Sequence, residues 1–142
     1  MKNAEKNYQF EIKCEAGEIG PTLKSILSKI EKEIEDSGEI LFKFELAARE
    51  MLANAIEHGC SLAASNGKKF DNLSIKTIVK IGEEKLIYSV QDPGPGFDWE
   101  NYDLKTMPKF EEKGRGLKMI NKVTEKMEFN QKGNKITVTF KV

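Results

Sequence analysis

Several features that define common classes of protein are missing from this sequence of 142 residues. It contains no apolar run near the roughly 20 residues that a membrane-spanning helix needs, and its polar N-terminus does not have the pattern of a signal peptide. Acidic and basic residues number 23 each, and no basic patch stands out, which argues against a nucleic-acid-binding surface. We therefore expect a cytoplasmic protein that contacts neither a membrane nor nucleic acid directly.

Histidine and cysteine are scarce, which limits the metal and disulfide chemistry available to the chain. The single histidine, His58, excludes any site that needs a histidine cluster, so a zinc site is not expected. The two cysteines, Cys14 and Cys60, lie far apart in the sequence and form no CxxC pair. We predict that both are reduced, structural thiols.

The two most common nucleotide-binding signatures are also absent. The sequence has neither the Walker pattern GxxxxGK[ST] nor GxGxxG, which excludes the P-loop and dinucleotide-binding folds. No internal repeat or low-complexity segment is found. The length suits a single domain, residues 1–142, that is large enough to bury a hydrophobic core.

The pattern of apolar residues predicts an α/β protein. Alternating apolar residues predict strands at 8–14, 73–81, 86–90, 127–129 and 136–142. Apolar residues at helical spacing predict helices from 20 to about 36, from 44 to 59 with Gly59 at the end, and from 117 to 123. Residues 61–72 and 92–113 are predicted loops. Because hairpins are predicted at the centre and at the end of the chain, we expect a two-layer sandwich with a mostly antiparallel sheet and helices on one face.

Two polar residues of the helix predicted at 44–59 lie on one face. Glu50 and Asn54 are about 40 degrees apart around the helix, and short or apolar residues such as Leu46 and Ala53 surround them. A carboxylate and an amide in such surroundings indicate the wall of a pocket. The alternative is a solvated surface with alanines that favour helix formation.

Two glycine-containing segments follow this helix. In the first, Asp92 can accept a hydrogen bond from an exocyclic amine, and Gly94 and Gly96 permit close approach of the backbone to a ligand, although an ordinary Asp-Pro-Gly turn has the same sequence. In the second, Gly114, Arg115 and Gly116 lead into a helix and can form an anion site suited to phosphate. Each segment alone is weak evidence.

Together and in this order, the three segments resemble a known family. E-x-x-x-N-A-x-x-H-G at 50–59, D-x-G-x-G-F at 92–97 and G-R-G-L at 114–117 are similar to the N, G1 and G2 boxes of the GHKL ATPase superfamily, which has the Bergerat ATP-binding fold. That superfamily includes gyrase, histidine kinases and mismatch-repair ATPases. The chain most resembles its smallest branch, the anti-sigma factor serine/threonine kinases.

The resemblance implies a role for each matching residue. Glu50 matches the general base, and Asn54 matches the ligand that binds Mg²⁺ through its amide oxygen. Asp92 matches the carboxylate that recognises adenine, assisted by Gly94 and Gly96. The segment 114–116 matches the hinge of a lid over the ATP phosphates, where Arg115 either contacts the γ-phosphate or faces water. Many relatives carry a threonine near the start of the last strand, whereas this chain has Asn134 and Lys135 there, so that contact stays unassigned.

The resemblance also implies a function and partners. The first hypothesis is an ATP- and Mg²⁺-dependent protein serine/threonine kinase that acts as an anti-sigma factor or partner-switching regulator. Its substrate is then a STAS-domain anti-sigma factor antagonist, and the kinase is a homodimer that also holds a sigma factor. The alternative hypothesis is a non-catalytic module that binds ATP as a conformational ligand and sequesters a sigma factor or another regulator.

Overall fold

The computed structural model describes residues 5–67, 72–97 and 112–142, and for residues 112–115 it describes the backbone alone. Most of the loop predicted at 92–113, residues 98–111, therefore lies outside the described residues. So does part of the loop predicted at 61–72.

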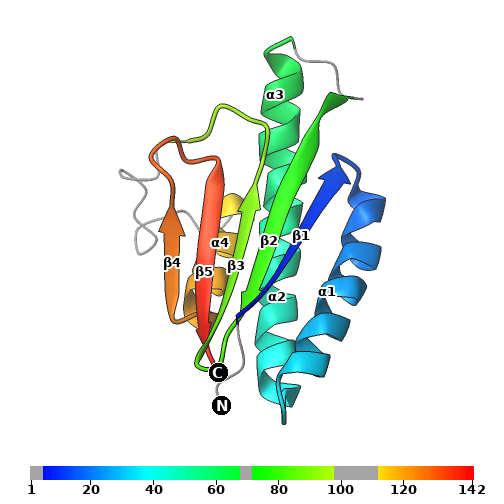
Figure 1. Cartoon of the computed structure of the whole chain (residues 1–142). Helices are drawn as coiled ribbons and strands as arrows, with labels where there is room; N and C mark the ends of the chain where they lie inside the picture. The colour runs from blue at the N-terminus through cyan, green and yellow to red at the C-terminus, as the bar shows by residue number, and fades with distance from the viewer. Residues whose placement is uncertain (1–4, 68–71, 98–111) are drawn as a thin grey trace.

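Five strands form one antiparallel sheet (Figure 1). In chain order they are β1 (Lys6–Lys13), β2 (Ser74–Ile81), β3 (Lys85–Gln91), β4 (Lys126–Phe129) and β5 (Lys135–Lys141). Their spatial order is β1-β2-β3-β5-β4, and every neighbouring pair is antiparallel. All five strands match the segments in which apolar and polar residues alternate.

The longer helices cover one face of this sheet (Figure 1). They are α1 (Ile19–Glu33), α2 (Gly38–Asn54) and α4 (Glu112–Val123), and α2 packs between the other two. A short 3₁₀ helix, η1 (Ala16–Glu18), precedes α1. Among the described residues, no helix is long and apolar enough to cross a bilayer. The predicted α/β two-layer sandwich with helices on one face is confirmed.

The core lies between the two layers, because alternate residues of each strand point towards the helices. Phe44 of α2 is fully buried and packs edge-to-face on Tyr88 of β3, with ring centroids 4.9 Å apart, and against Phe140 of β5. Burial raises the pKa of the Tyr88 phenol well above its usual range, so this side chain stays neutral inside the core.

The central helix is longer than the sequence predicts. It begins at Gly38, continues after α2 as a π-helix, η2 (Ala55–Cys60), and then as the short helix α3 (Ser61–Ser65). The prediction that Gly59 ends the helix is therefore wrong, as is the prediction that the loop begins at residue 61. The physical reason is that Gly59 does not adopt the left-handed conformation of a helix-terminating glycine. Its missing side chain instead makes room for Asp92.

The prediction of reduced cysteines is also wrong. Cys14, directly after β1, forms a disulfide with Cys60, the last residue of η2, and their Cα atoms are 6.0 Å apart. Their separation of 46 residues in sequence gave no sign of this contact. The two residues meet because helix α2 and its extension run along the sheet to the end at which β1 stops (Figure 1).

Candidate functional site

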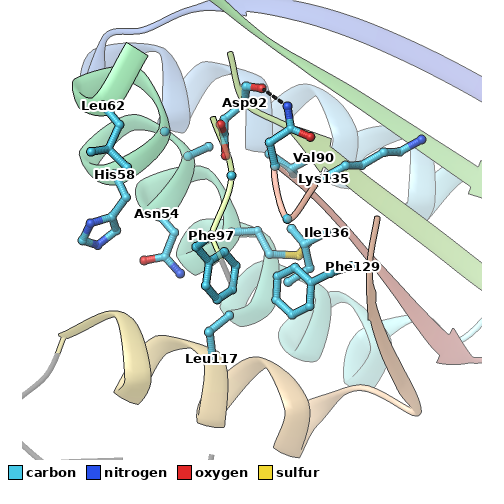
Figure 2. A pocket seen from close by; sticks show the side chains of 16 residues that line it. Asn54, His58, Leu62, Val90, Asp92, Phe97, Leu117, Phe129, Lys135 and Ile136 are labelled. Atoms are coloured by element: carbon cyan, nitrogen blue, oxygen red, sulfur yellow. Dashed lines mark hydrogen bonds between the residues drawn. The ribbon is translucent and has the colours of Figure 1, made fainter. Parts of the chain in front are cut away.

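One pocket brings together residues from all three sequence segments (Figure 2). Its wall on the helical side contains Asn54, at the end of α2, and His58 of η2. Asp92, which follows β3, lies at one end of the pocket, and Leu117 of α4 lies at the other. The pocket therefore forms where the helical layer and the strand ends meet.

The turn after β3 is held in a defined shape by hydrogen bonds. The backbone N–H of Gly94 donates to Oδ1 of Asp92 at 2.7 Å, and the N–H of Asp92 donates to the carbonyl of Asn134 at 2.9 Å. The side-chain amide of Asn134 donates to the carbonyls of Gly94 at 3.3 Å and of Asp92 at 3.4 Å. An ionised carboxylate only accepts hydrogen bonds, so Asp92 presents an acceptor to a ligand that carries an amino group.

Gly59 and Gly94 allow this turn to lie directly against the central helix. A Cβ atom placed on Gly59 would overlap the carboxyl group of Asp92, and one placed on Gly94 would lie 2.6 Å from the carbonyl oxygen of Gly59. Side chains at either position would therefore displace the Asp92 turn. The absence of side chains at these two residues sets the position of the carboxylate.

This packing leads to a prediction for Gly59→Ala. The added methyl group has to displace the Asp92 carboxylate, so we expect nucleotide affinity to fall at least ~10-fold and the free energy of unfolding to fall by about 1–3 kcal/mol. Calorimetric titration with ADP and chemical denaturation measure the two effects. Gly17→Ala is the matched control, because a Cβ atom at Gly17 meets nothing within 4 Å. Unchanged ADP affinity in Gly59→Ala would contradict the assigned position of Asp92.

Gly96 is required for a different reason. Its φ angle is 86°, in the left-handed region that side chains rarely adopt, and a Cβ atom there would overlap the carbonyl of Lys132. Gly96 therefore lets the chain turn beneath the loop that joins β4 to β5. Directly after it, Phe97 packs edge-to-face on Phe129 of β4 with ring centroids 5.1 Å apart, and both rings line the pocket (Figure 2).

Glu50 and Asn54 lie next to α4. A Cβ atom placed on Gly116, which is buried in α4, would lie 2.8 Å from Oε2 of Glu50 and 3.4 Å from Nδ2 of Asn54. The glycine thus brings the backbone of α4 within contact distance of both polar side chains. Among the described residues, neither side chain makes a hydrogen bond or ion pair with another protein group, which leaves both available to a ligand.

The third segment is placed differently from the prediction. Gly114, Arg115 and Gly116 do not precede the helix, because α4 already begins at Glu112. The N–H groups of a first helical turn have no partner within the helix, so an anion could be bound by the turn that contains Gly114. The side chain of Arg115 lies outside the described part of the structure, and its proposed contact with phosphate is not tested.

Asn134 is the site residue that the sequence did not reveal. It is buried, it lines the pocket, and it joins the turn before β5 to the Asp92 turn after β3. Thr137 pairs with Ser89 and Glu128 on the face of the sheet away from the helices, so it cannot replace the threonine of the resembling family. The available signal was the Gly-Asn pair at 133–134, at the position where many members of the resembling family carry a threonine after the glycine.

The histidine at the end of the sequence motif also faces the pocket. His58 is half-buried, and within the described residues its Nε2 atom is buried without a hydrogen-bond partner. It lies one turn after Asn54 on the same side of the helix, as Figure 2 shows. His58 therefore lies in the wall of the pocket.

The fold and this arrangement of residues define an ATP-binding domain of the GHKL type. The family model of the histidine kinase-like ATPase domain matches residues 18–140, and the chain belongs to that family. The comparison with curated proteins finds no match. Membership of the family supports ATP binding.

Proposed function

We propose that the protein is an ATP-dependent serine/threonine kinase that phosphorylates another protein. One observation carries this proposal: Glu50 and Asn54 lie together beside Gly116 of α4, and Asn54 lines the same pocket as Asp92. A nucleotide whose base contacts Asp92 would extend its phosphates towards Asn54 and α4. Glu50 would then lie near the γ-phosphate, where an acceptor hydroxyl has to enter.

The residues present fit a magnesium ion. Mg²⁺ binds few protein ligands and completes its coordination with water and phosphate oxygens, so the amide oxygen of Asn54 is a sufficient protein ligand. When bound, the ion neutralises charge on the transferred phosphoryl group. The chain itself supplies Asp92 to orient the base, Asn54 to hold the ion, and Glu50 to accept the proton of the attacking hydroxyl.

The acceptor is proposed to be a protein. The resembling branch of the family phosphorylates a STAS-domain anti-sigma factor antagonist, works as a homodimer and holds a sigma factor. We propose the same partners and the same cytoplasmic location here. The available carboxylate of Glu50 favours this reading over the alternative, a binding module in which ATP only changes conformation, because such a module needs no general base.

The role of Asn54 leads to a prediction that separates metal binding from base recognition. In Asn54→Ala we expect ADP affinity without Mg²⁺ to match the wild type, and the gain in affinity on adding Mg²⁺ to shrink at least ~10-fold, equivalent to about 1.4 kcal/mol. Calorimetric titration with and without Mg²⁺ measures both values. Asn7→Ala, which removes an exposed amide from β1, is the control. An undiminished Mg²⁺ effect in Asn54→Ala would rule out the assigned ligand.

The proposed function is tested by capture of partners from the native host. The tagged protein is incubated with host extract and ATP or ADP, and the captured proteins are analysed by mass spectrometry for phosphoserine and phosphothreonine. A STAS-domain protein that becomes phosphorylated with ATP, but not with Glu50→Gln, supports the kinase. Capture of a sigma factor or another regulator, with no phosphoprotein under either nucleotide, supports the binding module instead.

A further inference from the structure

The disulfide between Cys14 and Cys60 connects the outer strand of the sheet to the wall of the pocket. Cys14 follows β1, which pairs with β2 alone, and Cys60 ends the π-helix that carries His58 and Gly59. Both cysteines are buried, but their chain neighbours Lys13, Glu15 and Ser61 are exposed. A small local opening at this end of the sheet therefore suffices for another thiol to reach the bond.

The bond lies next to a tightly packed contact of the site. Gly59 is covalently joined to Cys60, and it touches both the Asp92 carboxyl group and the backbone at Gly94, with no room for even one extra methyl group. Because these groups are closely packed, a shift of the Gly59 backbone either moves the Asp92 carboxylate or opens a gap beneath it. The disulfide restrains this backbone through the adjacent residue.

The helix type makes this restraint important. η2 is a π-helix, a form that is rare in proteins and appears mostly as single turns at functional sites. Its wider turn lets Cys60 face the end of β1 while His58 faces the pocket. Without the covalent link, fewer constraints hold the six residues Ala55–Cys60 in this conformation. The segment can then adopt other backbone conformations, in which Gly59 no longer fits against Asp92.

We propose that Cys14 and Cys60 form a reversible thiol–disulfide site whose oxidation state sets the affinity of the pocket for nucleotide. The oxidised form holds Gly59 against Asp92 and binds nucleotide more tightly, and the reduced form binds it less tightly. The exchange partner is a dithiol/disulfide couple, either a small molecule or a protein. This inference rests on the proposed nucleotide site, but it does not require that the protein be a kinase.

The exchange needs no reactant other than the dithiol or its disulfide. Reduction begins when a thiolate of the dithiol attacks one sulfur of the disulfide and releases the other cysteine as a thiolate, which gives a mixed disulfide. The second thiolate of the dithiol then displaces the remaining cysteine. Two electrons and two protons pass to Cys14 and Cys60, and the partner becomes a disulfide. Oxidation is the reverse.

The test compares the oxidised and reduced wild-type protein directly. ADP affinity is measured by calorimetry after treatment with excess oxidised or reduced dithiothreitol, and thiols are counted in each sample. We expect at least ~5-fold weaker ADP binding in the reduced protein, within the usual range of coupling between two sites. Cys14→Ala, which breaks the bond but keeps Cys60, should show the weaker affinity in both buffers.

A second measurement does not depend on activity. Coupling between two sites is reciprocal, so saturating ADP should make the disulfide harder to reduce by the same factor. A 5-fold effect on this two-electron couple corresponds to a midpoint about 21 mV more negative, since a tenfold change is 29.6 mV. The midpoint is read from a titration with mixtures of reduced and oxidised dithiothreitol, with and without ADP.

Several results would overturn the inference. Two titratable thiols after oxidation would show that no disulfide forms, and ADP affinities equal within twofold would show that the disulfide is not coupled to the pocket. Loss of the native circular dichroism spectrum on reduction would show that the bond maintains the whole fold instead. No ADP binding in either form would overturn the nucleotide site together with this inference, whereas equal binding would leave the nucleotide site standing.

Discussion

Replacing Glu50 by glutamine is expected to slow ATP turnover by roughly 100- to 10,000-fold while ATP affinity stays within about twofold of the wild type. The amide has nearly the shape of the carboxylate, so the contact with Gly116 of α4 is preserved. The substitution removes the basic oxygen that would take the proton of the attacking hydroxyl. The expected result is therefore a loss of rate without a loss of binding, which is the behaviour of a group that acts mainly in the transition state.

The measurement is single-turnover formation of ADP, combined with a calorimetric titration of ATP. Glu57→Gln is the matched control, because Glu57 is an exposed carboxylate on the same continuous helix, whereas Glu50 is half-buried and lies beside Gly116 of α4. We expect wild-type rate and affinity for this control. If Glu50→Gln keeps the full rate, the base is a different residue, or the protein does not catalyse phosphoryl transfer.

The second large effect is expected from Asp92→Asn. The asparagine oxygen can still accept the N–H of Gly94, so the turn should persist and the free energy of unfolding should change by less than about 0.5 kcal/mol. The new amino group, however, would face the amino group of adenine, and two donors cannot form a hydrogen bond. We expect ADP and ATP to bind roughly 100-fold more weakly, as when a charged hydrogen bond is lost and its partner is left unpaired.

Guanine nucleotides provide the control for Asp92→Asn, because guanine carries a carbonyl where adenine carries its amino group. The wild-type carboxylate should repel that oxygen, and the asparagine amide should donate to it. GDP affinity should therefore stay constant or rise in the variant while ADP affinity falls. ADP affinity that is unchanged, as measured by calorimetry, would show that another group recognises the base.

The sequence predicted the layers of this fold well, because its signals are local. Alternation of apolar residues in the five strands, and helical spacing around Phe44 and Leu52, depend on near neighbours in the chain. The predicted hairpins account for two of the sheet pairings, β2 with β3 and β4 with β5. The branch of the family and the partner proteins stay predictions, because no described residue bears on them.

The sequence predicted less about contacts between distant segments. Gly59 was assigned to a helix end because that is the common use of glycine after an apolar helix, whereas its function here depends on Asp92, which is 33 positions further along the chain. The disulfide joins residues that are 46 positions apart, and the hydrogen bond from the Asn134 amide to the Gly94 carbonyl joins residues that are 40 positions apart. Nothing in local composition encodes such distances, so only the folded arrangement reveals them.

The hydrogen bonds between Asn134 and the Asp92 turn determine when the site can form during synthesis of the chain. The Asn134 amide holds the Asp92–Gly94 turn from the start of β5, the last strand of the sheet to leave the ribosome. Since β5 is also the strand that lies between β3 and β4, the sheet cannot be completed before it pairs. A nascent chain that already contains Glu50, Asn54 and Asp92 therefore has the ligand-binding groups but not the hydrogen bonds of Asn134 that hold the Asp92 turn, so nucleotide can favour folding only after β5 has been synthesised.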